Sequence, residues 1–515
     1  MSTIRQIVVN TMTGWGSVLT RTALAFYMVP FLLQQMGRSG YGIVGLLGVL
    51  LSLSEVADLG LRQALGRELA EQVTREDQQA FNELANTGFL FYIAIGFLLA
   101  AGCLVFAPIC ISFFKVPVEL QPMTIRAVRI FGTGSFILSF ISAVFTAALT
   151  SRNRFDLRNN IESGCMIATN LVMILVLKTV DNKLYGWVFV MLAGQLLTVA
   201  LFFLAAVRTC PWLKLHYRHI RIDRAWSLLQ FGWKVYVLQL TNLIAERADP
   251  LVISRYFGPA GVALYSAGSR LSGILRPVVL TLSTQLHPLA VRQHVENALE
   301  KQQRMLIDGT RYTLLMGVYF SVTLFVFAEP FCALWLGKTL GADYLAVVRI
   351  AQLWAVVDLM VCTSSMQWPM MLGAKRLNAI MLIHGSTAIL NIVLSVYFAG
   401  YTSLGISGVL VGTMVSGLVL RPVLIGYGAL VFKIPIQQFF RDALARPLLL
   451  AGLLIPAAYA IRFAVAPAGY LSLIICGAAT GLVWLVLMAG VAFTAQERRW
   501  AGVRIKGLVS SVLHP

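Results

Sequence analysis

The chain has 515 residues, of which 58% are hydrophobic and 12% are charged, and its mean hydropathy is +0.78. These values exclude an ordinary soluble globular protein and indicate a membrane protein. The net charge of +19 would suit a nucleic-acid partner, but the basic residues follow the membrane topology given below, so no nucleic-acid partner is predicted.

The seven cysteines are scattered, without a C-x-x-C pair and without histidines at ligand spacing. Neither a disulfide framework nor a metal site is therefore predicted, and no cofactor is expected.

Apolar segments long enough to cross the roughly 30 Å hydrocarbon core recur along the whole chain. Each must be a helix, because only helices and closed barrels satisfy their backbone hydrogen bonds in lipid. The first segment has no small-x-small cleavage site after it and is expected to stay as a span. The sequence therefore predicts an all-α polytopic membrane protein with about fourteen spans, at 7–34, 41–61, 86–114, 123–149, 159–178, 184–207, 227–255, 260–289, 310–336, 344–372, 377–399, 404–432, 447–465 and 469–494.

Arginine and lysine are unevenly shared between the two sides of these spans. With a cytoplasmic N-terminus, the inner loops and tails hold the basic clusters at 62–75, 152–158, 208–224 and 498–506. The outer loops hold few basic residues, namely Arg38, Lys115, Lys178, Lys183, Arg255 and Lys338. This bias places both termini in the cytoplasm.

The chain repeats itself at a nearly constant shift. The matched features are Pro30 and Pro250, the glycine-containing turns at 37–42 and 258–261, Val128-Arg129-Ile130 and Val348-Arg349-Ile350, and Asn170-Leu171-Val172 and Asn391-Ile392-Val393. Matches in the same order at one shift indicate a duplication. Six spans per copy give both copies the same orientation, and parallel repeats of this kind place a substrate between them.

The predicted division of the chain follows from this repeat. It comprises a six-helix lobe at 1–208, a basic cytoplasmic linker at 209–226, a second six-helix lobe at 227–433, and residues 434–515 with helices 13 and 14 and a basic tail. The linker is either an ordinary surface segment or a segment that contacts anionic lipids.

Spans seven and eight are unusually charged for membrane helices. An ionisable group near the bilayer centre costs about 2.5 to 3.5 kcal/mol on insertion scales, so it must face protein, water or a ligand. Arg21 and Arg270 are the main candidates, because a helix rises only about 1.5 Å per residue and both lie too deep in their spans to reach the interface. The residues predicted to bind substrate are Arg21, Arg270, Arg276, Lys234 and Arg247.

Four carboxylates inside spans are candidates for coupling transport to H⁺ or Na⁺, namely Glu55, Asp249, Glu246 and Asp358. Structural alternatives stay open for them. Glu246 and Asp249 share a helix face and could form ion pairs with Arg247 or Arg255. Asp358 could equally be the partner of an arginine.

Pro30 and Pro250 occupy matching places near the outer ends of spans one and seven. Because proline removes an i to i−4 hydrogen bond, both are predicted to be hinges at which these spans bend as an outer gate closes.

The stretch Pro30-Phe31-Leu32-Leu33, with 36–42 and then 58–70, resembles the opening of the Wzx-type polysaccharide flippases of the multidrug/oligosaccharidyl-lipid/polysaccharide (MOP) exporter superfamily. The twelve-plus-two plan of spans extends this resemblance to the whole chain. The resemblance implies MATE-like lobes that translocate undecaprenyl-diphosphate-linked oligosaccharides by alternating access through a cationic cavity, in the synthesis of surface polysaccharides such as exopolysaccharide or O-antigen. It also implies residence in the bacterial cytoplasmic membrane, with membrane lipids, a polysaccharide polymerase and chain-length machinery as further partners.

Three other functions stay open at this point. A lipid II flippase shares the fourteen-span plan. A cation-coupled drug extruder would favour carboxylates and aromatic residues in its cavity, whereas arginines are at least as numerous here among the central charges. A membrane glycosyltransferase or polymerase would need an aqueous catalytic domain or a long outer loop, and every predicted outer loop is short, so the chain is not predicted to be an enzyme.

Overall fold

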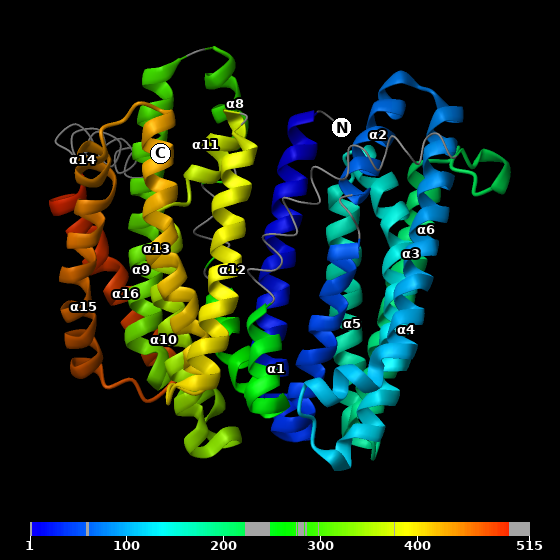
Figure 1. Cartoon of the computed structure of the whole chain (residues 1–515), viewed down its shortest axis with the longest axis horizontal. Coiled ribbons are helices and arrows are strands. Elements are labelled where there is room, and N and C mark those ends of the chain that lie inside the picture. The colour runs from blue at the N-terminus through cyan, green and yellow to red at the C-terminus, as the bar shows by residue number, and fades with distance from the viewer. Residues whose placement is uncertain are drawn as a thin grey trace, which may run out of the picture. The chain divides into compact units, whose positions relative to one another are not determined.

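The structure is a computed structural model that describes residues 3–57, 61–221, 248–273, 276, 283, 286–296, 298–374 and 376–493. Every element in these ranges is helical (Figure 1). Ten of the described segments are long and apolar enough to cross a membrane. The prediction of an all-α, multi-pass membrane protein is therefore confirmed. The count of fourteen spans stays a prediction, because 222–247 and most of 274–285 lie outside the described residues.

The chain divides into two compact units, residues 1–266 and 267–515. The first unit contains α1 (Thr3–Ala57), α2 (Leu61–Arg75), α3 (Gln78–Phe113), α4 (Gln121–Ser151), α5 (Phe155–Thr179), α6 (Lys183–Thr209), short 3₁₀ turns at Val118–Leu120 and Tyr217–His219, and the helical residues 248–266. The predicted lobe boundary at 209–226 stays a prediction, since part of that linker lies outside the described residues.

The second unit contains α8 (His287–Val295), α9 (Leu299–Leu340), α10 (Tyr344–Cys362), α11 (Gln367–Gly373), α12 (Leu377–Tyr401), α13 (Ser407–Val431), α14 (Ile436–Phe439), α15 (Arg446–Val465) and α16 (Tyr470–Leu487). Short pieces lie at Gly341–Asp343, Phe440–Ala445 and Met488–Ala492. The helical residues 267–273 continue the segment that begins at 248.

The predicted spans one and two form one element, α1, which is kinked at Gly37 with φ 68° and ψ −179°. Only glycine adopts such a backbone without strain, because it has no Cβ atom. Gly258, with φ 66°, stands at the matching place in the helical residues 248–273. A positive-φ glycine therefore recurs at the place where the predicted repeat would put it.

Helix bounds repeat in the same way. Both α5 and α12 have 25 residues, and the first and last residues of one are displaced from those of the other by the same number of positions. This agreement supports the predicted duplication. The two halves of the predicted repeat differ at one place. Helix α4 runs unbroken for 31 residues, whereas the matching segment is split into α10 and α11 by a turn at 363–366.

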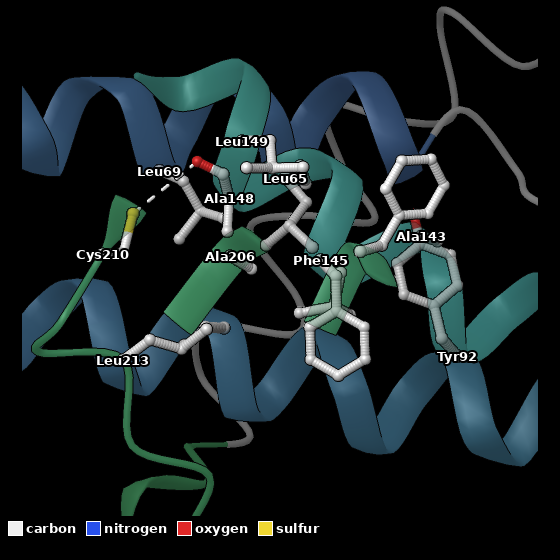
Figure 2. Packing of buried hydrophobic residues seen from close by; sticks show 14 of the residues in the cluster. Leu65, Leu69, Tyr92, Ala143, Phe145, Ala148, Leu149, Ala206, Cys210 and Leu213 are labelled. Atoms are coloured by element: carbon white, nitrogen blue, oxygen red, sulfur yellow. Dashed lines mark hydrogen bonds between the residues drawn. The ribbon is translucent and has the colours of Figure 1, made fainter. Parts of the chain in front are cut away.

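The first unit packs α2, α3, α4 and α6 around a buried apolar cluster, part of which is drawn in Figure 2. Leu65 and Leu69 of α2 lie in it, and Tyr92 of α3 stacks on Phe140 of α4 with ring centroids 5.8 Å apart. Helices in lipid associate mainly through such close packing, because lipid tails are as apolar as the side chains. The cluster fixes the position of α3, which in turn holds the linker.

Polar side chains of α3 fasten the first part of the linker. Asn82 donates from Nδ2 to the carbonyl of Trp212 (2.9 Å) and accepts from the amide of Lys214 (2.7 Å). Asn86 repeats this one helical turn later, donating to the carbonyl of Lys214 (2.8 Å) and accepting from the amide of His216 (2.8 Å). The extended linker therefore pairs with two asparagine side chains as it would with a neighbouring β-strand.

Cys210, at the start of this linker, is fully buried, and its Sγ lies 3.8 Å from the carbonyl oxygen of Ala148 (Figure 2). Burial raises the pKa of the Cys210 thiol above its ordinary value, although the positive charge of Arg152 acts in the opposite direction. Arg152 lies over the ring of Trp212, 4.7 Å from its centroid. The linker is thus anchored at both its cysteine and its tryptophan.

In the second unit, α13 packs against α12 through a G-x-x-x-G pair. A Cβ atom at Gly408 would lie 2.5 Å from the carbonyl oxygen of Phe398, and one at Gly412 would lie 2.6 Å from the amide nitrogen of Ser395. Small residues at this spacing let two helix backbones touch.

Asn86→Ala should loosen the linker, because it leaves the carbonyl of Lys214 and the amide of His216 without their partner. The lost pairing is worth about 1–3 kcal/mol, so hydrogen exchange in 212–221 should accelerate roughly 5- to 150-fold. Mass spectrometry of the purified protein measures this. Ser112→Ala, which removes only an exposed hydrogen bond within α3, is the control and should leave the exchange unchanged. Equal exchange in both variants would contradict the anchoring role.

Gly412→Ala should destabilise the protein, because overpacking a close contact costs about 1–3 kcal/mol. Gly426, in the same helix, has no atom within 4 Å of its hypothetical Cβ. Gly426→Ala should therefore be neutral or stabilising by up to about 1 kcal/mol, since alanine is the better helix former. Thermal unfolding in detergent compares the two. A Gly412→Ala variant that melts no lower than Gly426→Ala would disprove the contact.

Candidate functional site

Several predicted site residues cannot be placed. Lys234, Glu246 and Arg247 lie outside the described residues, and so does the side chain of Glu55 in α1. Their proposed roles therefore stay predictions.

Arg21 and Arg270 are both exposed on the surface of their own unit, Arg21 on α1 and Arg270 on the helical residues 267–273. Neither guanidinium makes a hydrogen bond or an ion pair with any residue that the structure describes. Arg462 of α15 is neutralised by contrast, because it lies 2.6 Å from Glu329 of α9 and also donates to the carbonyl of Val326. Among the described residues, Arg21 and Arg270 therefore have only water or an external anion as a partner, and their role in substrate binding stays a prediction.

Asp249 is buried at 3% exposure and accepts a hydrogen bond of 2.7 Å from the hydroxyl of Tyr265. The two residues lie on opposite sides of the kink at Gly258. The guanidinium of Arg255 lies over the ring of Phe113, 5.6 Å from its centroid. The other predicted ion-pair partner, Arg247, lies outside the described residues, so that alternative stays open. One oxygen of the Asp249 carboxylate accepts from a neutral donor within its own segment.

Asp358 of α10 and Arg276 are brought together in the second unit. The Nε atom of Arg276 lies 3.9 Å from Oδ1 of Asp358, while the hydroxyl of Ser272 donates to Oδ2 at 2.5 Å. Of the two readings of Asp358 from the sequence, this geometry favours the partner of an arginine. The contact links the helical segment that contains Ser272 to α10, which lies much further along the chain.

Arg421 of α13 belongs to the same cluster, and the sequence analysis overlooked it. One of its nitrogens donates to the hydroxyl of Ser364 (3.0 Å), in the turn between α10 and α11. Its charge and that of Arg276 both lie close enough to Asp358 to act on the carboxylate. The sequence could have indicated Arg421 as a candidate, because it stands in the middle of a 25-residue apolar helix, just as Arg270 stands in a predicted span.

The predicted hinges lie in regular helix in this state. Pro30 is inside α1, whose backbone departs from helical geometry at Gly37 instead. Near this kink, a Cβ atom at Gly42 would collide with the carbonyl oxygen of Pro259. One state does not test bending, so Pro30 and Pro250 stay predicted hinges. Within the described ranges, no three His, Cys, Asp or Glu side chains gather as metal ligands would.

The sequence and the fold were compared with those of known proteins. The polysaccharide biosynthesis protein family matches residues 36–349. The succinoglycan biosynthesis transport protein ExoT of Rhizobium meliloti (strain 1021) is 24% identical over 477 residues, which cover 90% of this chain and 87% of ExoT. The uncharacterized membrane protein EpsK of Bacillus subtilis (strain 168) is 22% identical over 414 residues, which cover 79% of this chain and 80% of EpsK.

Among solved structures, the lipid II flippase MurJ in its inward closed conformation is similar in fold, with a TM-score of 0.72 at 15% identity over 94% of this chain and 98% of MurJ. The family match covers more than half of the sequence and includes much of the stretch that carries the resemblance noted above. This chain therefore belongs to the polysaccharide biosynthesis protein family.

Proposed function

We propose that the protein is a flippase that moves undecaprenyl-diphosphate-linked oligosaccharide from the inner to the outer leaflet of the bacterial cytoplasmic membrane, for surface polysaccharide synthesis. The observation that carries the proposal is that Arg21 and Arg270, exposed on apolar helices of a polysaccharide-family membrane protein, have no ion pair with any residue that the structure describes. The transport relative supports movement of a substrate rather than its chemical conversion, so the protein is a transporter and not an enzyme.

The chemistry of the substrate fits these arginines. A diphosphate is a concentrated anion, and a guanidinium binds phosphate through a rigid fork of donors without ever losing its charge. The polyprenyl tail needs no polar path, because it can stay in the bilayer. Only the diphosphate and the sugars need an aqueous route, which the two lobes would open to each leaflet in turn, with both termini in the cytoplasm.

The test of the function is the fate of the precursor in a deletion strain. Loss of a flippase should leave lipid-linked oligosaccharide accumulated in the membrane while surface polysaccharide disappears. Normal surface polysaccharide and no accumulated precursor would overturn the proposal. Accumulation of lipid II instead would identify a lipid II flippase, and increased sensitivity to cationic drugs alone would identify a drug extruder.

Arg270→Ala and Arg21→Ala should abolish surface polysaccharide when they complement the deletion strain, because the diphosphate loses its charged contact. Lysine at either position keeps the charge but loses the bidentate fork, so export restored by Lys would show that charge alone matters. Arg75→Ala is the control, since Arg75 is exposed and its partner is Glu71 in the same helix. Wild-type polysaccharide from well-expressed Arg270→Ala and Arg21→Ala variants would refute their role.

Coupling of transport to H⁺ or Na⁺ is assigned to Asp249, a buried carboxylate that accepts from the neutral hydroxyl of Tyr265. Asparagine keeps an oxygen that can accept from Tyr265 but cannot bind a proton or balance a cation. Asp249→Asn should therefore abolish export, while Tyr265→Phe should only weaken it, with Glu119→Gln on an exposed turn as the control. Export is read as surface polysaccharide at equal membrane levels. Full export by Asp249→Asn would leave Asp249 a purely structural residue.

A further inference from the structure

Buried polar atoms without partners gather where α10–α11 faces α13. Gln367, the first residue of α11, is fully buried, and neither polar atom of its amide has a hydrogen-bond partner among the described residues. The side chain lies against α13, where a Cβ atom at Gly428 would collide with its Oε1. Leaving such a group unsatisfied costs about 1–3 kcal/mol, and folded proteins contain few of them.

Four further side chains of this region carry buried atoms of the same kind. Within the described ranges, Nε of Arg276, Oδ1 of Asp358, Nε of Arg421 and Nε2 of His384 also lack hydrogen-bond partners. His384 of α12 meets the ring of Trp368 in α11 edge-on at 5.2 Å and lies within electrostatic range of Arg421. Buried polar atoms without hydrogen-bond partners, concentrated in one region, indicate a binding site for a polar ligand or water.

The charges of the surrounding side chains indicate the charge of such a ligand. Two guanidinium groups share one carboxylate, so the cluster keeps an excess positive charge that would repel a cation. Asp358 does not fully neutralise Arg276, because their nearest atoms are 3.9 Å apart, too far for a hydrogen bond. Ser272 holds the other oxygen of Asp358 and so restrains the carboxylate from closing on the arginine. Arg421 has a neutral hydroxyl, Ser364, as its partner and forms no salt bridge with a carboxylate that the structure describes.

We propose that this cluster is an oxyanion site within the second unit, in which Arg421 and Arg276 bind a phosphate or diphosphate group and Gln367 lies at its edge. A guanidinium matches the tetrahedral oxygens of phosphate better than it matches a spherical ion. The inference rests on the proposed function and deepens it, by adding a contact for the substrate's diphosphate that is separate from Arg21 and Arg270.

The break between α10 and α11 gives the site its shape. In α4, the continuous counterpart, every central backbone group continues the helical ladder. In the second unit the chain turns at 363–366, which places the hydroxyl of Ser364 at Arg421 and Gln367 one turn further on. The site therefore belongs to one copy of the repeat.

Direct binding tests the proposal. The full chain, purified into phosphatidylcholine nanodiscs, is titrated by calorimetry with inorganic pyrophosphate, with farnesyl diphosphate, and with farnesol as the blank. Arg421→Gln should weaken diphosphate binding about ten- to a hundredfold, the worth of one charge-assisted contact. The matched control is Arg462→Gln, because Arg462 is another membrane-helix arginine whose charge Glu329 already balances, and it should bind as the wild type does.

The two soluble probes separate the sources of the ligand. Binding of farnesyl diphosphate alone would support a lipid-linked diphosphate, and equal binding of pyrophosphate would support a free phosphate compound at the same site. Absence of binding to the wild type, or unchanged affinity in Arg421→Gln, would overturn the site. If Arg421→Gln does not elute as a single folded species, Arg276→Gln replaces it under the same criteria.

Failure of this site and failure of the proposed function can be told apart. Loss of pyrophosphate binding in Arg421→Gln would support the site even if the deletion strain accumulated no lipid-linked saccharide, because the titration uses purified protein. Accumulated precursor together with unchanged diphosphate binding in the arginine variant tested would overturn the site and leave the flippase function standing.

Discussion

The cost of a charged group inside an apolar membrane governs this protein more than any other constraint. The chain meets it in three ways. Arg462 is balanced by a carboxylate, Asp249 accepts from a tyrosine hydroxyl, and Arg21 and Arg270 face outward from their own units without a described partner. Arg462 shows that the chain can supply a carboxylate to a membrane-helix arginine. The exposed Arg21 and Arg270 have no such partner among the described residues, and for this reason we propose them as substrate contacts.

The same constraint explains why the helices fit so closely elsewhere. Glycines let α13 touch α12, and aromatic rings fill the space between α3 and α4, so that the apolar parts hold together without help from water. The free energy gained from this packing offsets the cost of a few buried polar groups without hydrogen-bond partners. The cluster around Asp358 is one such group, and the packing of the helices around it holds it in place.

Periodicity and composition predicted the membrane class and most of the described spans, because these properties are local. The internal repeat was inferred by comparing the chain with itself and stays a prediction. The pairing of Arg276 with Asp358 was not predictable, since nothing in one sequence relates two positions so far apart in the chain. The break after Cys362 was also missed, because Thr363, Ser364 and Ser365 resemble ordinary small residues of a membrane helix. Asn86 stands at the edge of the predicted span 86–114 and Asn82 just before it. Their hydrogen bonds to the linker depend on an extended backbone partner that only the tertiary structure brings beside them.

The anchored linker has a practical consequence for dividing the polypeptide. Helix α6 ends at Thr209, and the connecting segment after it is where a protein would ordinarily be cut into two co-expressed fragments, since chain breaks are best tolerated in exposed loops. Here such a cut would remove Trp212, Lys214 and His216 from the fragment whose asparagines bind them, and would expose Cys210 and its apolar surroundings to solvent. A fragment that keeps all of these hydrogen bonds must extend at least to Arg221, whose amide nitrogen donates to the hydroxyl of Thr87.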